Sequence, residues 1–246
     1  MKVAAYQAPL AACGSMEVLD LIRDQVRRCE SAGVEFLCCP EAVLGGLADY
    51  SERPAEIAID VEGGQLSEIL AQLASDSVTT ILGFTEIDWR GRLFNSAAVF
   101  SRGSVVGVYR KLHPAINHSI YHPGDGAPVF TVAGLTFGIV ICRDSTFEEP
   151  ARSMAARGAA VLFVPTNNGM PPGKCGPELA SETRNVDIAR AMSNNVWVVR
   201  ADVAGRTPGL VAHGTSGIVG PGGNVLASAA PSDELIVAEI HPSRAS

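Results

Sequence analysis

The sequence has few basic side chains and no long apolar run, and each shortage excludes a class of protein. It carries 19 Lys and Arg against 26 Asp and Glu, so its formal net charge is −7. That sign disfavours binding to nucleic-acid phosphates or anionic lipid headgroups, and no nucleic-acid partner is predicted. No uninterrupted apolar stretch approaches the roughly 18 residues of a transmembrane helix, so no membrane association is predicted either.

Cysteines are also scarce. Six in 246 residues are too few for a disulfide scaffold, and the adjacent Cys38 and Cys39 cannot both face one partner from a strand. The N-terminal stretch MKVAAYQAPLAAC superficially resembles a lipoprotein signal, but Tyr6, Gln7 and Pro9 interrupt it, and its alternation favours a first β-strand. We therefore predict a cytoplasmic protein.

What the chain does have is a high apolar content arranged in short repeating units. Apolar residues make up 47% and charged residues 18%, which is typical of a folded globular protein. β-Branched runs alternate with segments of helical period, and no linker or low-complexity tract divides them, so one domain over 1–246 is predicted. Expected helices cover 16–32, 65–75, 149–157 and 178–194. Expected strands cover 2–7, 34–39, 78–84, 93–100, 104–109, 135–142, 159–164, 196–202, 215–219 and 235–240. The pattern predicts an α/β protein with mixed sheets and helices on the outer faces.

Three polar residues stand at the ends of apolar strands, where side chains of neighbouring strands converge on a pocket. They are Glu41, Lys111 and Cys142. Each also has an ordinary interpretation, because a glutamate or lysine at such a position is commonly solvated and a cysteine is commonly a small buried apolar residue. A strand-to-helix elbow at Cys142 would instead lift a nucleophile out of the sheet.

Taken in order and in context, the three residues resemble a known family. They occur in CCPEAVLGG, YRKLHP and ICRDSTFEEPAR, which are similar to the three signature segments of the nitrilase superfamily of carbon–nitrogen hydrolases. Further similar segments are YHPGDG, ARAMSNNVWVV and GTSGIVGPGGNVLA, so the resemblance spans nearly the whole chain. It implies a four-layer α–β–β–α sandwich with the three residues at one end. It also implies a homodimer or higher homo-oligomer built through the outer helices.

The resemblance implies that Glu41 is the general base, Cys142 the nucleophile and Lys111 the stabiliser of the tetrahedral intermediate. Physical reasoning supports these roles, because a thiol is only partly ionised at neutral pH and an adjacent carboxylate can take its proton. Lys111 and the backbone N–H of Arg143 could stabilise the developing oxyanion. No metal or organic cofactor is needed.

One position departs from the family pattern. The family usually places a second glutamate shortly before the aromatic-x-Pro-Gly segment, where this chain has Asn117. An asparagine still accepts a hydrogen bond from Lys111 but removes a negative charge from the pocket, which bears on substrate preference and catalytic competence.

The predicted function is hydrolysis of a non-peptide carbon–nitrogen bond in a small linear carboxamide, through a cysteine thioester that releases ammonia or an amine. Two alternatives stay open, namely nitrile hydrolysis and an acyl-transferring or binding relative with weakened hydrolysis. Thr146 stands where relatives acting on dicarboxylate monoamides carry an arginine, so that means of recognising a carboxylate is absent.

Two other arrangements of the same residue types are conceivable. His113, His118 and His122 could form a zinc site, but the prolines and glycine among them disfavour a regular helix. A Cys142–His113 dyad is possible, although a structural hydrogen-bonding role is expected for His113. Cys175 lies in a Gly- and Pro-rich segment that could border the site.

Overall fold

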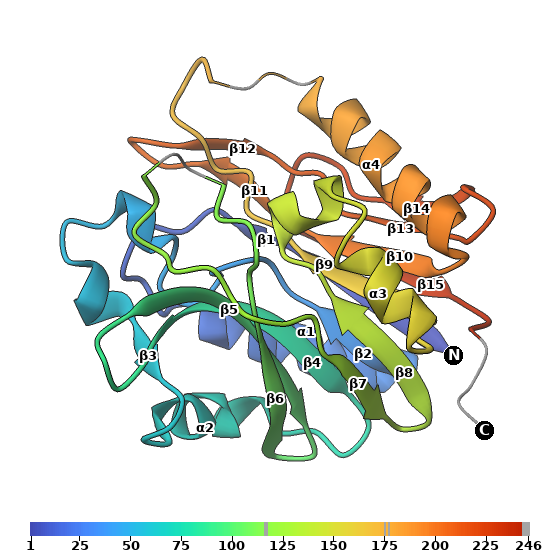
Figure 1. Ribbon diagram of the computed structural model, residues 1–246, viewed down its shortest axis with the longest axis horizontal. Helices are drawn as coiled ribbons and strands as arrows, with labels where there is room; N and C mark the ends of the chain where they lie inside the picture. Colours follow the sequence, from blue (N-terminus) through green and yellow to red (C-terminus); the bar gives the residue numbers. More distant parts are fainter. Residues whose placement is uncertain (116–117, 175, 177, 243–246) are drawn as a thin grey trace.

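The computed structural model describes residues 1–115, 118–174, 176 and 178–242. Figure 1 shows two β-sheets stacked face to face, with helices on both outer sides. In the described part of the chain the α-helices are α1 (Val18–Ala32), α2 (Gln65–Leu70), α3 (Ala151–Ala156) and α4 (Leu179–Asn194). Short 3-10 helices are η1 (Ala48–Tyr50), η2 (Pro54–Ile57), η3 (Ala71–Leu73) and η4 (Cys142–Thr146). None of the described helices is long and apolar enough to cross a membrane.

The first sheet has nine strands among the described residues. It runs in the order β12-β11-β1-β2-β4-β5-β6, with β15 also paired to β1 and β3 to β4. Its strands are β1 (Lys2–Pro9), β2 (Val34–Cys38), β3 (Ile59–Asp60), β4 (Thr79–Ile87), β5 (Leu93–Ser101), β6 (Ser104–Arg110), β11 (Val203–Arg206), β12 (Val211–His213) and β15 (Glu234–Glu239). β1, β2 and β4 are parallel, whereas β4, β5 and β6 are antiparallel, so the sheet is mixed as predicted.

The second sheet has six described strands in the order β14-β13-β10-β9-β8-β7. They are β7 (Val129–Val132), β8 (Leu135–Ile139), β9 (Val161–Pro165), β10 (Trp197–Ala201), β13 (Gly217–Val219) and β14 (Val225–Ser228). β8, β9 and β10 are parallel, and antiparallel strands lie on both sides of them.

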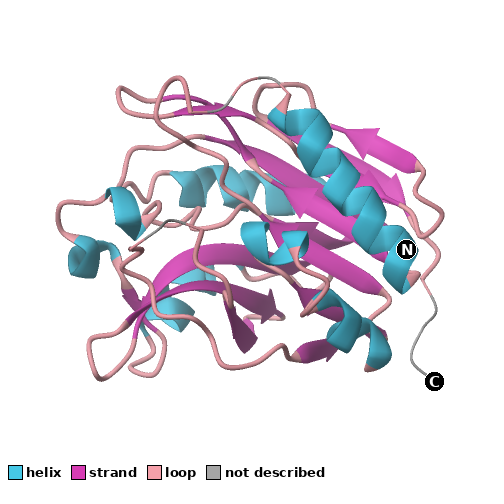
Figure 2. Ribbon diagram, turned by 45° about the horizontal axis from the view of Figure 1, so that its top comes forward, coloured by secondary structure: helices cyan, strands magenta, loops and turns pink. Residues whose placement is uncertain are grey.

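Alternation along the strands builds two apolar layers. On β1, Val3 and Ala5 face the second sheet and belong to the larger apolar core. Ala4 and Tyr6 point the other way and belong to a second apolar core with residues of α1 and α2. A strand buried on both faces is apolar almost throughout, which explains the nearly continuous apolar runs of the sequence. α3 and α4 contact the outer face of the second sheet. Figure 2 shows this order of helix, sheet, sheet and helix, which confirms the predicted sandwich.

The element boundaries differ from the predictions at two places that shape the site. The strand expected over 135–142 ends at Ile139, and the chain then turns into η4, which begins at Cys142. The strand expected over 196–202 is also shorter, because β10 ends at Ala201 in the second sheet and β11 begins at Val203 in the first. Asp202 is therefore the point at which the chain crosses between the sheets.

Candidate active site

Glu41 lies in a tight turn directly after β2. Its backbone N–H donates to the carbonyl of Thr166 at 3.2 Å, and the residue is 1% exposed. The turn packs against Gly83 of β4, where an added Cβ would lie 2.6 Å from the Glu41 Cα and 2.4 Å from the Ala42 nitrogen. Only glycine allows β4 to come this close to the turn, so Gly83 sets the position of Glu41.

Three donors converge on the Glu41 carboxylate. Oε1 accepts from Lys111 Nζ at 2.5 Å and from Asn95 Nδ2 at 2.7 Å, and Oε2 accepts from the backbone N–H of Asn167 at 2.9 Å. All of these donors lie within or just after strands β5, β6 and β9. The carboxylate is thus held in one orientation by three hydrogen bonds.

Lys111 follows β6 and is 3% exposed. Its backbone N–H donates to the carbonyl of Asn95, and its carbonyl accepts from Gly124, each at 2.8 Å. Burial has the largest single effect and would lower the pKa of the Lys111 ammonium, but the charge and hydrogen bond of Glu41, together with the charges of Cys142 and Asp144, outweigh it and leave that pKa raised. Lys111 is therefore a fixed positive charge inside the molecule.

Cys142 is the first residue of η4, and its φ of 45° is in the left-handed region, which a side-chain-bearing residue rarely adopts. The turn is held by the Ser145 hydroxyl, which donates to the Cys142 carbonyl at 2.7 Å. Burial raises the pKa of the Cys142 thiol to about 12, the charge of Glu41 adds to this rise, and Lys111 opposes it. A thiol with this pKa is protonated at neutral pH, so Cys142 would need a base in order to attack a substrate.

A buried ion pair supports this turn from below. Arg200 of β10 donates from Nη2 to the Ser145 hydroxyl at 2.9 Å and from Nη1 to Thr166 Oγ1 at 2.6 Å. Its charge is balanced by Asp187 of α4, whose Oδ1 lies 2.6 Å from Nη2. Arg200 is 2% exposed and Asp187 is fully buried. The pair links β10 to the backbone of Cys142 through the Ser145 hydroxyl.

The three predicted residues face one pocket of about 510 Å³. Its walls combine apolar side chains with a few fixed polar groups, which is typical of a site for a small molecule. The lining residues are Glu41, Leu47, Asp49, Tyr50, Asn95, Lys111, Pro114, Ala115, Tyr121, Cys142, Asn167, Asn168, Gly169, Met170, Pro171 and Lys174.

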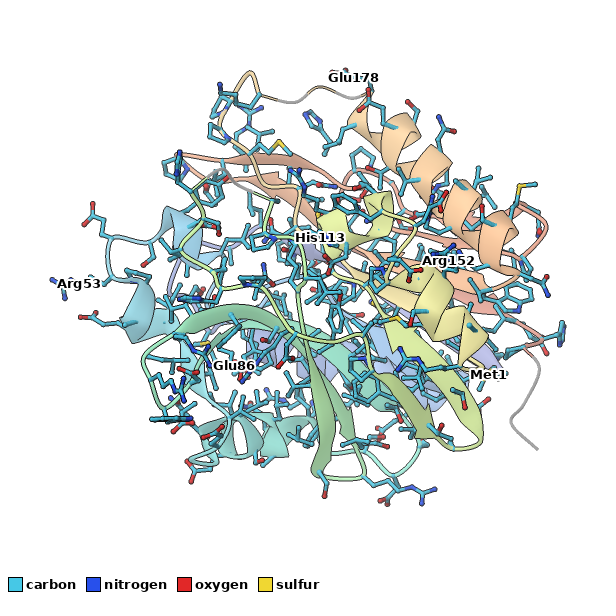
Figure 3. The ribbon with its side chains drawn as sticks, viewed as in Figure 1. Met1, Arg53, Glu86, His113, Arg152 and Glu178 are labelled. Atoms are coloured by element: carbon cyan, nitrogen blue, oxygen red, sulfur yellow. The ribbon has the colours of Figure 1, made fainter. Side chains whose placement is uncertain are left out.

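The remaining sequence candidates have other surroundings. His113 lies near the centre of the view in Figure 3, and its Nδ1 is 3.0 Å from Asp144 Oδ1 while its ring stacks on Phe147. That contact corresponds to the structural role expected for His113. The Arg143 side chain donates to the carbonyl of Ala115 at 3.1 Å. Asn117 and Cys175 lie outside the described residues. Within the described ranges, no three His, Cys, Asp or Glu side chains gather as a metal site would require.

Sequence reasoning missed the polar residues that hold the predicted ones. Asn95, Arg200 and Asp202 are all at most 2% exposed, although each is polar and lies within or directly after an apolar strand. A charged residue in a buried strand is rare unless it is paired. The two charged residues in the apolar segment WVVRAD could therefore have indicated Arg200 and Asp202.

Comparison with known proteins identifies the family. The model of the carbon–nitrogen hydrolase family matches residues 2–246. A nitrilase from Pyrococcus abyssi is 32% identical over 219 residues, which cover 87% of this chain and 80% of that protein. An (R)-stereoselective amidase from a Pseudomonas species is 32% identical over 209 residues, which cover 84% of this chain and 73% of that protein. The chain belongs to the carbon–nitrogen hydrolase family, which confirms the resemblance in the sequence.

A solved structure agrees on the fold. A mutant of the Nesterenkonia AN1 amidase, from the nitrilase superfamily, superposes with a TM-score of 0.82 at 24% identity. The match covers 98% of this chain and 90% of that one. The two proteins share the sandwich architecture.

Proposed function

We propose that this protein hydrolyses small linear carboxamides through a thioester on Cys142, releasing ammonia or an amine. The observation that carries the proposal is the Glu41–Lys111 pair, joined at 2.5 Å, in the same pocket as Cys142. The pocket therefore brings a base, a cation and a nucleophile together. Membership in the carbon–nitrogen hydrolase family and the similar amidase support the choice of an amide.

In the first half of the reaction Cys142 Sγ attacks the amide carbon while Glu41 takes the thiol proton. The carbonyl oxygen gains negative charge, which the Lys111 ammonium and the backbone N–H of Arg143 stabilise. The carbon–nitrogen bond then breaks, and the nitrogen leaves with the proton that Glu41 had taken. A thioester remains on Cys142.

In the second half, Glu41 draws a proton from water as the water attacks the thioester carbon. The intermediate expels the Cys142 sulfur, which regains its proton, and the carboxylic acid is released. Because every step moves only protons and one acyl group, the residues described suffice, and the proposal includes no cofactor.

Two further proposals concern the setting of the enzyme. The described cysteines, Cys13, Cys29, Cys38, Cys39 and Cys142, are free thiols, which supports a reducing cytoplasm. Met192 on α4 is 58% exposed, and we propose that the outer helices form a homodimer or higher homo-oligomer. Light scattering of the purified protein measures that state.

The test of function is ammonia release from a panel of short aliphatic carboxamides, compared with the nitriles of the same chain length. Turnover of amides by the parent protein, lost in Cys142→Ala, is the expected result. Turnover of nitriles alone would favour the nitrilase alternative, which the similarity to the Pyrococcus nitrilase keeps open. Capture of an acyl group without turnover would favour the acyl-transfer alternative.

A further inference from the structure

Asn168 presents its side-chain oxygen to the nucleophile. Its Oδ1 lies 3.9 Å from Cys142 Sγ, and both residues line the pocket. Asn168 follows β9 by a few residues and is 6% exposed, so its side chain belongs to the interior wall of the site rather than to the surface.

A buried carboxylate fixes this orientation. Asn168 Nδ2 donates to Asp202 Oδ2 at 3.0 Å and to Thr215 Oγ1 at 3.3 Å, and the Asn168 backbone N–H donates to Asp202 Oδ1 at 3.0 Å. A carboxylate only accepts hydrogen bonds, so the amide nitrogen of Asn168 must face Asp202. Rotating the Asn168 side-chain amide by half a turn would place Oδ1 against the Asp202 carboxylate, where two acceptors repel each other. The oxygen is therefore left facing Cys142.

Asp202 itself is satisfied as an acceptor. In addition to the two bonds from Asn168, it accepts from Thr215 Oγ1 at 2.7 Å and from the Val203 backbone N–H at 2.8 Å. It is fully buried at the crossing between the two sheets and does not contribute to the described lining of the pocket. Its hydrogen bonds reach the pocket lining through Asn168, and its charge also contributes to the raised pKa of the Cys142 thiol.

The chemistry near Asn168 Oδ1 follows from the proposed function, on which this inference rests. The nitrogen of the scissile amide is bonded to the carbon that Cys142 Sγ attacks, two bonds from sulfur, so a substrate orientation exists in which it lies within hydrogen-bond reach of an acceptor 3.9 Å from Sγ. The carbonyl oxygen of the substrate is directed to Lys111 instead. An acceptor such as Oδ1 attracts an N–H and repels an oxyanion.

We propose that Asn168, oriented by Asp202, accepts a hydrogen bond from the N–H of the scissile amide and thereby selects substrates whose scissile nitrogen carries hydrogen. In the free enzyme the Cys142 thiol donates a weak hydrogen bond to Asn168 Oδ1. When the amide N–H replaces it, the thiol proton is released toward Glu41. The held nitrogen then keeps its lone pair free to take that proton as ammonia leaves. Nitriles and esters lack such a donor.

The test compares two substrates that form the same thioester. Propionamide and S-methyl thiopropionate both leave a propionyl group on Cys142, but only propionamide has an N–H at its leaving group. In Asn168→Leu, which keeps the size and removes the acceptor, we expect kcat/KM for propionamide to fall about tenfold or more, the effect of one lost hydrogen bond. We expect kcat/KM for the thioester to change less than about twofold.

Asp202→Asn gives an independent variant that alters no described pocket-lining residue. The side-chain oxygen of the substituted residue must still accept from the Val203 and Asn168 backbone N–H groups, so its new amide nitrogen faces Asn168 Nδ2. Two donors cannot pair, so we expect the Asn168 side-chain amide to rotate by half a turn. The amide-to-thioester ratio of kcat/KM should fall in this variant as well. Asn194→Leu, on the outer helix α4, is the control for a change of asparagine to leucine and should leave both substrates unchanged.

Equal losses for the two substrates would show that Asn168 only supports the position of Cys142, and would overturn the proposal. An unchanged rate on propionamide would overturn it as well. Failure of the proposed function gives a different result, since the parent protein would then turn over neither propionamide nor the other carboxamides of the panel.

Discussion

Glu41 and Lys111 form a buried ion pair in which Oε1 lies 2.5 Å from Nζ and each side chain is at most 3% exposed. The two residues are 70 positions apart and follow strands β2 and β6 of the same sheet. Breaking such a pair leaves one charge buried alone, which costs about 3–5 kcal/mol in folding free energy. The pair therefore serves the stability of the protein as well as the proposed chemistry, and the experiments must separate the two.

The proposed role of Cys142 as nucleophile is tested by Cys142→Ala, which should abolish amide turnover and leave the thermal unfolding transition in place. Iodoacetamide should modify Cys142 before Cys38 or Cys39, because both of those side chains are fully buried whereas Cys142 borders the pocket. Peptide mass spectrometry at short reaction times gives the order of modification. Residual turnover by the alanine variant would exclude the thioester mechanism.

The proposed role of Glu41 as general base is tested by Glu41→Gln, which keeps the shape of the side chain but cannot take the thiol proton. We expect acylation to slow by about 10²–10⁴-fold, as is usual for loss of a general base. Glu86→Gln is a matched control, since Glu86 is another buried carboxylate of the same sheet, pairs with Arg110 and lines a different pocket from Cys142. It should lower stability while amide turnover at a temperature well below unfolding is kept. Similar losses of activity in the two variants would mean that Glu41 acts through folding alone.

The raised pKa of the Cys142 thiol, about 12, predicts how alkylation depends on pH. Below its pKa a thiol forms about tenfold more thiolate for each pH unit, so the alkylation rate should keep rising from about pH 7 to 10. An ordinary thiol, with a pKa of about 8.5, levels off within that range. Glu41→Gln removes a charge that raises this pKa, so the variant should react faster than the parent at about pH 8 although its turnover is slower. A plateau near pH 9 in the parent protein, about where an ordinary thiol levels off, would contradict this prediction.

Gly83→Ala tests how the Glu41 turn is positioned. The new Cβ would meet the Glu41 backbone at 2.6 Å, so the turn must move away from β4. A misplacement of about 1 Å at a catalytic group can lower the rate about 10²-fold, and we expect a loss of that order in kcat/KM. Gly126→Ala is the control, because a Cβ at that position has open space around it. Parent activity in Gly83→Ala would show that the turn tolerates displacement.

Asn117→Glu tests the departure from the family pattern. An added carboxylate that faces the substrate should repel anionic substrates and act on neutral ones only indirectly, so kcat/KM should fall more for an anionic amide than for a neutral amide of matched size. Equal changes for the two substrates would show that residue 117 does not face the substrate.

Periodicity and motifs in the sequence predicted the helices, ten of the strands, the sandwich class and the three polar residues at strand ends. The short strands β3, β7, β11, β12 and β14 were not predicted. Alternating and continuous apolar runs depend on local periodicity, and the signature segments are contiguous, so both can be recognised without coordinates. The hairpin predicted over 93–100 and 104–109 is present as β5 and β6 for the same reason.

The surroundings of those three residues depend on how the two sheets pack and could not be predicted from the sequence. Asn95 and Asn168 reach the pocket, and Asp202 reaches Asn168, because β5, β9 and the crossing after β10 come together at the same place, which depends on strand order across two sheets. Nothing in the local sequence of Asp202 indicates that the chain changes sheets there, since hydrogen-bond partners 34 residues away in Asn168 and 13 away in Thr215 hold it. Long-range pairing of buried polar groups is set by packing, and periodicity along the chain does not encode it.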